Sequence, residues 1–287
     1  MERILTVQDI SCIGRCSLTV ALPIISAMGV ECAILPTAVL STHTAFEGFT
    51  FRDLSEDLDG IVAHWVKEGF GFGAIYTGYL GSEQQIDIVS RIFDTFEGGY
   101  RVVDPVMGDN GALYPGFGKK FPKKMAALCK KADILLPNMT EACLLLGIPY
   151  PKEGYSEAFV KDVLVKLAAL GPRYTVLTGV DTRLDSLGVT CYDSKYGSFY
   201  HYRHERLAQS FHGTGDIFSS AFTGALVTTG KVDQAMRVAA DFTVKCIKVT
   251  LADDEAKKKA GKPTPTFRYG VDFERAMPYL ISRMQEE

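Results

Sequence analysis

The sequence predicts an α/β fold in which helices cover a mostly parallel sheet. Six short apolar runs typical of strands are each followed by a loop or a helix: Ile4–Val7, Cys32–Leu35, Ala74–Thr77, Arg101–Asp104, Ile134–Leu136 and Thr175–Thr178. Strands that alternate with helices favour parallel pairing. Several of the runs are continuously apolar, as expected of strands that are buried on both faces. Functional residues should therefore gather at the carboxyl ends of these strands.

Helices are predicted between these runs, and glycine marks where they end. The predicted helices are Ser17–Met28, Leu54–Lys67, Glu83–Phe96 and Ser156–Leu170, closed by Gly29, Gly69, Gly98 and Gly171. Glycine adopts the left-handed conformation that commonly ends a helix. Alternating residues over Leu187–Tyr192 and Ser198–Tyr202 indicate an antiparallel hairpin at an edge of the sheet. A final helix is predicted near Val271–Met284.

Length and charge narrow the class of protein. We expect one domain over residues 1–287, because α/β folds often reach this length undivided. The 31 basic and 34 acidic residues give a net charge of −3, which provides no positive field for a nucleic acid or an anionic membrane. No apolar run approaches the roughly 20 residues of a membrane span, and no signal-peptide pattern is present, so we expect a cytoplasmic protein.

Two composition features have ordinary interpretations. The seven cysteines are dispersed and odd in number, which predicts reduced thiols. Residues 257–259 form a lysine cluster that follows three acids, and we interpret it as a solvated loop.

The strongest local signal is Gly213-Thr214-Gly215-Asp216, which leads into an apolar stripe at helical spacing that ends near Gly230. Glycines let the backbone approach a ligand closely, and the first amides of a helix bind anions such as a phosphoryl group. Asp216 is the candidate catalytic carboxylate at that position. Taken alone, the segment is equally well explained as an ordinary capped helix start.

Two further motifs place polar groups after predicted strands. Asp104 ends one strand, and a Pro/Gly-rich loop brings Asp109; two such carboxylates suit Mg²⁺ beside a nucleotide. In Pro137-Asn138-Met139-Thr140-Glu141, Asn138 begins a helix and Glu141 shares its face. In isolation, the first motif is as easily a simple turn, and the second is more often an ordinary helix start that resembles a capping box.

In this order and spacing, Asp-Pro-Val-Met-Gly-Asp, Pro-Asn-x-x-Glu and Gly-Thr-Gly-Asp resemble the ribokinase-like superfamily over nearly the whole chain. The resemblance implies a three-layer α/β/α fold with a mostly parallel central sheet and a small antiparallel edge hairpin. Gln8 with Gly14, residues 41–44 and Thr77-Gly78-Tyr79 look like pyridoxal kinases. That family implies ATP-dependent phosphorylation of the 5′-hydroxymethyl group of a vitamin B6 vitamer (pyridoxal, pyridoxine or pyridoxamine), for salvage of pyridoxal 5′-phosphate. It also implies Mg²⁺ as a cofactor and a homodimer.

The resemblance implies roles for matching residues. Asp216 would be the general base, and Gly213, Thr214 and Gly215 would form the anion hole for the transferring phosphoryl group. The ATP and phosphate set would be Asp104, Asp109, Asn138, Glu141 and Thr178, of which Asp104 and Glu141 would hold Mg²⁺. Asp9, Thr44 and Tyr79 would line the substrate pocket, with Tyr79 over the pyridine ring. The loop from Asp109 to Gly118 would be a mobile cover over the phosphates.

Two residues depart from the family pattern. Asp9 stands where pyridoxal kinases often have serine, so a contact to the substrate ring would be charged and the preferred vitamer stays open. Leu136 stands where some relatives have a hydroxyl residue that helps to bind a monovalent cation. We interpret His43 as structural, because a lone loop histidine seldom acts in chemistry.

Three other functions fit the same residues. A sugar kinase of the superfamily is disfavoured because the chain lacks the Gly-Gly-rich opening of those enzymes. A hydroxymethylpyrimidine kinase often has cysteine where this chain has Asp216. A non-catalytic vitamer-binding protein would not need the acids that phosphoryl transfer requires.

Overall fold

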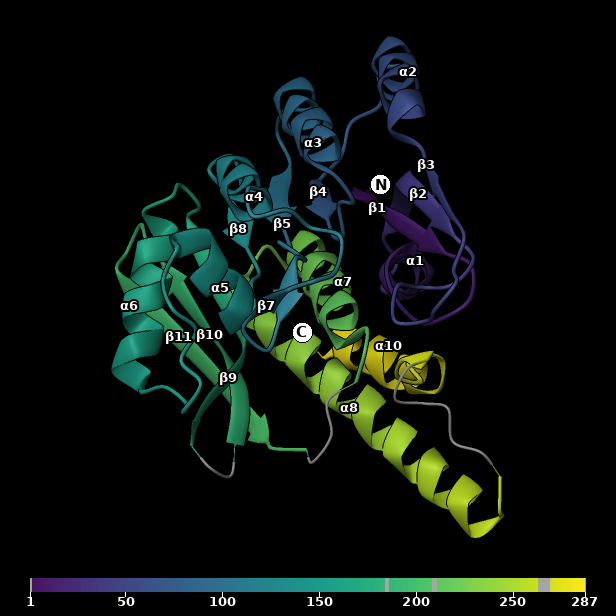
Figure 1. The fold of residues 1–287 in the computed structure, drawn as a ribbon, viewed down its shortest axis with the longest axis vertical. Coiled ribbons are helices and arrows are strands. Elements are labelled where there is room, and N and C mark those ends of the chain that lie inside the picture. Colours follow the sequence, from purple (N-terminus) through teal and green to yellow (C-terminus); the bar gives the residue numbers. More distant parts are fainter. Residues whose placement is uncertain (1, 184–185, 208–210, 263–268, 287) are drawn as a thin grey trace. The chain divides into compact units, whose positions relative to one another are not determined.

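The computed structural model describes residues 2–183, 186–207, 211–262 and 269–286 (Figure 1). The chain forms two compact units. One unit contains Met1–Asp53 and Leu207–Glu287, and the other contains Leu54–Arg206.

The first unit is built on a β-α-β element. Strand β1 (Arg3–Ser11) pairs in parallel with β2 (Glu31–Leu40), and helix α1 (Leu18–Ala27) connects them and packs on both. The short strand β3 (Phe51–Asp53) pairs antiparallel with β2. Parallel strands need such a crossover, because a tight turn cannot join them.

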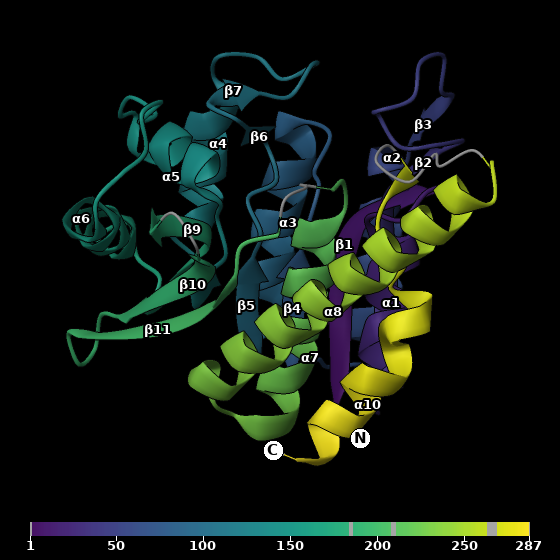
Figure 2. The ribbon, with the colours of Figure 1, turned by 90° about the horizontal axis from the view of Figure 1, so that it is seen from below.

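Two long helices complete the first unit. Helix α7 (Thr214–Thr229) packs against α1 and α8 (Val232–Lys259), and α7 and α8 lie side by side in both Figure 1 and Figure 2. A 3-10 turn η1 (Glu274–Ala276) leads into α10 (Met277–Gln285), which packs on α8. The apolar stripe from Ile217 to Leu226 is buried, and a left-handed Gly230 ends α7 as predicted.

In the second unit, six strands lie side by side in the order β11-β10-β9-β8-β5-β4. Four of them pair in parallel: β4 (Ala74–Thr77), β5 (Tyr100–Val103), β8 (Ile134–Leu135) and β9 (Tyr174–Arg183). Strands β10 (Ser186–Asp193) and β11 (Ser198–Glu205) form the predicted antiparallel hairpin beside β9. The helices are α2 (Ser55–Lys67), α3 (Glu83–Thr95), α4 (Phe121–Cys129), α5 (Met139–Leu146) and α6 (Glu157–Ala168). A small separate hairpin joins β6 (Gly108–Asp109) to β7 (Ala112–Leu113).

The six predicted strands and the four predicted helices are all present, with ends that differ by a few residues. Two predictions were wrong. The lysines at 257–259 are the last turn of α8 rather than a loop, because the helix continues with a Lys257–Asp253 ion pair one turn apart. The final helix begins at the 3-10 turn, because Val271 and Phe273 are buried in a non-helical segment.

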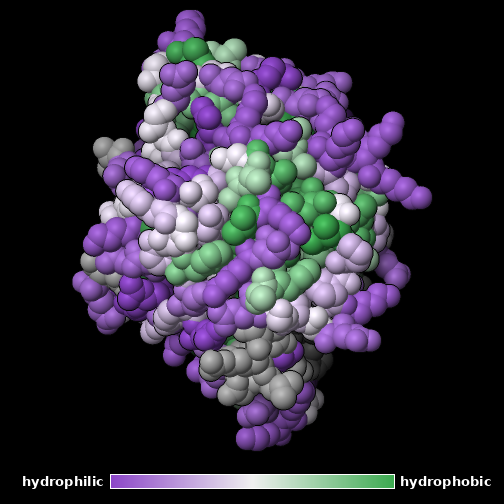
Figure 3. All heavy atoms as spheres, turned by 90° about the vertical axis from the view of Figure 1, so that its left-hand side faces the viewer, coloured by the Kyte–Doolittle hydropathy of each residue, from purple (hydrophilic) through white to green (hydrophobic). Residues whose placement is uncertain are grey.

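The surface and the cysteines are unremarkable for a globular protein. In Figure 3, hydrophilic side chains cover most of one face and apolar side chains gather near its middle. Within the described ranges, no helix is long and apolar enough to cross a membrane. All seven cysteines are free thiols, and five of them are buried.

Candidate active site

In the first unit, the glycine loop begins helix α7. Gly213 has φ of +80°, and a side chain there would collide with the backbone oxygen of Arg15, so only glycine fits. Thr214 donates a hydrogen bond to the backbone oxygen of Phe211 at 3.2 Å, which closes the turn. The first amides of α7 have no carbonyl acceptor within their own helix. Such unpaired amides are able to bind an anion, so the anion hole stays a prediction that this geometry permits.

Asp216 lies in the first turn of α7. Its Oδ2 accepts a hydrogen bond of 3.0 Å from the amide of Ser17, at the start of α1. Burial raises the pKa of Asp216 from 3.8 to about 6, and the Ser17 hydrogen bond opposes that rise. At neutral pH the carboxylate is thus ionised and has a higher proton affinity than an exposed aspartate, which suits a general base.

Asp9, near the end of β1, is almost completely buried. It accepts hydrogen bonds from the hydroxyls of Ser17 (2.6 Å) and Ser11 (3.1 Å). Burial, and then the negative charge of Asp216, raise its pKa from 3.8 to about 6. Sequence reasoning missed both serines. The signal for Ser17 was its place at the start of a predicted helix, but that place predicts a cap rather than a carboxylate ligand.

The predicted substrate loop follows β2. Thr44 is exposed, whereas the neighbouring His43 is buried and stacks on His212 with ring centroids 4.2 Å apart. The ring of His43 also fills the space that a side chain at Gly14 would need. His43 thus packs the segment that carries Thr44 against the glycine loop, in agreement with its predicted structural role.

In the second unit, Asp104 and Glu141 follow neighbouring strands and are both buried. Asn138 accepts from the Glu141 amide at 2.9 Å, and Glu141 accepts from the Asn138 amide at 2.9 Å, which is a complete capping box at the start of α5. Glu141 also accepts from the amide of Met107 at 3.2 Å. Two residues of the predicted ATP and phosphate set, Asn138 and Glu141, therefore also form the helix cap.

The electrostatics of this pair fit a cation. Burial holds the pKa of Glu141 well above its usual value, because it disfavours the charged form. The negative charge of the nearby buried Asp104 raises that pKa further, because like charges repel. Within the described part of the chain, no three His, Cys, Asp or Glu side chains gather at a metal-binding distance. Two carboxylates fit Mg²⁺, which is usually held by one or two protein carboxylates with phosphates and water.

The remaining predicted residues of the second unit have other contacts. Asp109 is exposed and accepts from the amide of Asn110 at 2.8 Å, within its own hairpin. Thr178, in β9, donates to the backbone oxygen of Pro137 at 3.3 Å. The ring of Tyr79 lies 5.5 Å from Phe117, which stacks on Phe121 at 3.9 Å. Phe117 belongs to the predicted cover loop and was not singled out from the sequence.

The predicted residues thus form two sets. The first unit carries Asp9, Thr44, Gly213, Thr214, Gly215 and Asp216, and the second carries Tyr79, Asp104, Asp109, Asn138, Glu141 and Thr178. The model of the phosphomethylpyrimidine kinase family matches residues 22–262 of this chain. The chain belongs to this family. This match confirms the ribokinase-like superfamily that the three motifs indicated.

Three relatives place the chain within the family. Pyridoxal kinase PdxY of Granulibacter bethesdensis is 27% identical over 86% of this chain and 89% of that protein. A candidate phosphomethylpyrimidine kinase from Bacteroides thetaiotaomicron, whose crystal form contains pyridoxal, is 36% identical, with a TM-score of 0.88 over 97% of this chain and 95% of its own. Pyridoxal kinase from Lactobacillus plantarum is 30% identical, with a TM-score of 0.88 over 100% of this chain and 99% of its own. These structures confirm the predicted α/β fold with mostly parallel strands and an antiparallel hairpin.

Proposed function

We propose that this protein is an ATP-dependent kinase that phosphorylates the 5′-hydroxymethyl group of a vitamin B6 vitamer. The observation that carries this proposal is Asp216, a carboxylate of raised pKa behind a glycine loop at the start of a helix. The relatives named as pyridoxal kinases, and the related structure that contains pyridoxal, support the substrate class.

The first unit supplies the proton acceptor and the anion site. Asp216 accepts the proton of the substrate hydroxyl while the hydroxyl oxygen forms a bond to the γ-phosphorus of ATP. The bond between the γ-phosphorus and the oxygen that bridges it to the β-phosphate breaks, and ADP leaves. The amides of residues 213–215 stabilise the charge on the phosphoryl group, because they are already oriented and need no rearrangement. Asp9 and Thr44 line the substrate pocket in this proposal.

The second unit supplies groups for the nucleotide. Asp104 and Glu141 would hold Mg²⁺, which neutralises charge on the phosphates when it is bound. Asn138, Asp109 and Thr178 complete the phosphate set in this proposal. Tyr79 packs on the substrate ring, and residues 109–118 exclude water from the phosphates.

A hydroxymethylpyrimidine kinase is the second candidate, because a relative from Aquifex aeolicus that is 26% identical over 75% of this chain is named hydroxymethylpyrimidine/phosphomethylpyrimidine kinase. Both substrates present a hydroxymethyl group on a nitrogen heterocycle, so the same base would serve either. Measurement of ADP release with pyridoxal, pyridoxine, pyridoxamine, hydroxymethylpyrimidine and ribose separates the two. We expect turnover with a B6 vitamer. Preference for the pyrimidine would establish the second candidate, and binding of pyridoxal without ADP release would establish a non-catalytic vitamer-binding protein.

Three further properties belong to this proposal. The two units act as one kinase domain, the protein is cytoplasmic, and it is a homodimer. The resemblance supports the dimer, and the free thiols suit a reducing compartment. Sedimentation equilibrium of the purified protein tests the dimer, and a single mass of about 31.5 kDa would contradict it.

A further inference from the structure

The residue before α1, Ser17, has an unusual backbone. Its φ of 52° and ψ of −137° lie in a region that glycine occupies readily and other residues rarely do. Within the described ranges, Asn110 is the only other non-glycine residue with positive φ. Strain of this kind persists only where the surroundings hold it, and it gathers at functional sites.

Ser17 contacts two carboxylates from different elements. Its amide donates to Oδ2 of Asp216 at 3.0 Å, and its hydroxyl donates to Oδ1 of Asp9 at 2.6 Å. Serine at this position of a helix usually caps the helix amides, but the Ser17 side chain makes no such bond. The hydroxyl is therefore committed to Asp9 and the amide to Asp216.

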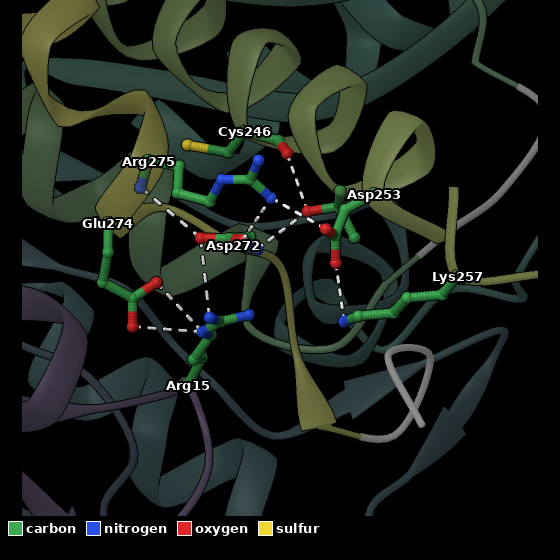
Figure 4. A network of polar contacts seen from close by, with 8 residues as sticks. Arg15, Cys246, Asp253, Lys257, Asp272, Glu274 and Arg275 are labelled. Atoms are coloured by element: carbon green, nitrogen blue, oxygen red, sulfur yellow. Dashed lines mark hydrogen bonds and ion pairs between the residues drawn. The ribbon is translucent and has the colours of Figure 1, made fainter. Parts of the chain in front are cut away.

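The surroundings hold the Ser17 backbone through Arg15. The amide of Arg15 donates to the backbone oxygen of Tyr269 at 3.0 Å, and its guanidinium pairs with Glu274 at 3.0 Å and Asp272 at 3.5 Å (Figure 4). Gly213 and Gly270 both leave room for the backbone of Arg15, where a side chain would collide with it. The turn between β1 and α1 is thus fixed by the glycine loop and by the carboxyl-terminal segment.

We infer that Ser17 is a positioning residue that holds Asp216 and Asp9 as an acid pair and leaves Oδ1 of Asp216 available for the substrate proton. This inference rests on the proposed function. In the described structure, the Ser17 amide is the only hydrogen-bond donor to Asp216, so this hydrogen bond fixes the orientation of the carboxylate. A base that is fixed before the substrate arrives needs no reorientation during proton transfer.

The pair also sets the pH response. The titratable groups that face Asp216 are Asp9 and the buried Cys16 thiol, whose pKa is raised by burial and which stays neutral. Loss of the Ser17 hydroxyl removes a group that lowers the pKa of Asp9. The hydroxyl bond to Asp9 also helps the Arg15 contacts to hold residue 17 at positive φ, so without it the amide moves from Asp216 and the pKa of Asp216 rises too.

The test compares Ser17→Ala and Ser17→Gly with Ser11→Ala as a matched control. Ser11 also donates a hydroxyl hydrogen bond to Asp9, but within the described residues it forms no hydrogen bond with Asp216. Carboxyl ¹³C titration of the full chain without substrate reads both aspartates. We expect both pKa values to rise in Ser17→Ala, and only that of Asp9 to rise in Ser11→Ala. An unchanged Asp216 titration in Ser17→Ala, or an equal change in Ser11→Ala, overturns the inference.

Steady-state kinetics of the Ser17 variants provide a second test of the inference. We expect both Ser17 variants to lose kcat at pH 8, on the order of ten-fold, with an unchanged KM for ATP. Ser17→Gly should have the higher Tm, since glycine relieves the strain at positive φ. If kcat instead follows Tm, the role is only structural and the inference fails. A wild-type protein without kinase activity would contradict the proposed function, whereas the titration still decides the role of Ser17.

Discussion

At the residue scale, Asp216 combines ionisation at neutral pH with an elevated proton affinity. Its pKa of about 6 lies above the value of 3.8 for an exposed aspartate, so the folded state is stabilised when Asp216 is protonated. That contribution is present at low pH and is lost as the pH rises from about 4 to 6. The buried carboxylate, ionised at neutral pH, therefore lowers the stability of the folded protein there.

We therefore predict opposite effects of Asp216→Asn on stability and rate. The asparagine side chain keeps the shape of aspartate and an oxygen that accepts from Ser17, but it carries no charge. Tm at pH 8 should therefore rise, and the free energy of unfolding should increase by at most roughly 3 kcal/mol. The value of kcat should fall about 10²–10⁴-fold, because the proton acceptor is lost. Calorimetry and steady-state kinetics check the two effects, and near-normal turnover would contradict the assignment of the base.

The pH dependence of kcat follows from the same group. Protonated Asp216 cannot accept the substrate proton, so kcat should decline as the pH falls through about 6 and level off above about 7. A pH profile with saturating ATP and substrate checks this expectation.

Asp9→Asn should move the acidic limb of that profile to lower pH, because a neutral side chain no longer repels the charge of Asp216. A limb that stays in place would mean that the two acids do not interact.

At the element scale, the start of α5 is both a helix cap and a proposed ligand set. Asn138→Ala should cost about 1 kcal/mol of stability through the lost cap, and should also reduce turnover. Ser156 caps α6 in the same way, through the amide of Phe159 at 3.2 Å, but belongs to no predicted site. Ser156→Ala is therefore the matched control. Equal losses of turnover in the two variants would show that Asn138 acts only as a cap.

At the scale of the whole chain, Arg15 joins segments that are far apart in the sequence. Its ion pairs with Asp272 and Glu274 are part of a network that includes Arg275, Asp253 and Lys257 (Figure 4). With 21% of its side chain exposed, Arg15 is less exposed than most paired cations among the described residues, so solvent screens its ion pairs less.

We expect Arg15→Ala to lower the free energy of unfolding by about 1–3 kcal/mol, because it leaves the partly buried Asp272 with a single cation. Arg91→Ala is the control, since the Arg91–Asp59 pair is exposed and such pairs contribute at most about 1 kcal/mol. Urea unfolding of both variants measures the difference. Equal stabilities would show that the Arg15 network does not fasten the carboxyl-terminal segment.

The local elements and the candidate chemistry were readable in the sequence. Apolar runs and helix-closing glycines located the strands and helices, because burial and left-handed conformations depend on residues close in the chain. The order of three motifs indicated the superfamily, and with it Asp216, Asp104 and Glu141. The extension of α8 through residue 259 was missed, because a charged helix end and a charged loop have the same composition.

Only the tertiary structure decided how those residues are held. Asp9, Ser17 and Asp216 come from β1, the start of α1 and α7, and no local pattern predicts that one serine contacts both acids. The same holds for Arg15, whose partners lie more than 250 residues later in the chain. Sequence patterns record which groups a segment buries or exposes, whereas hydrogen bonds between distant segments arise only when the elements pack, and that packing sets the proton affinity of Asp216.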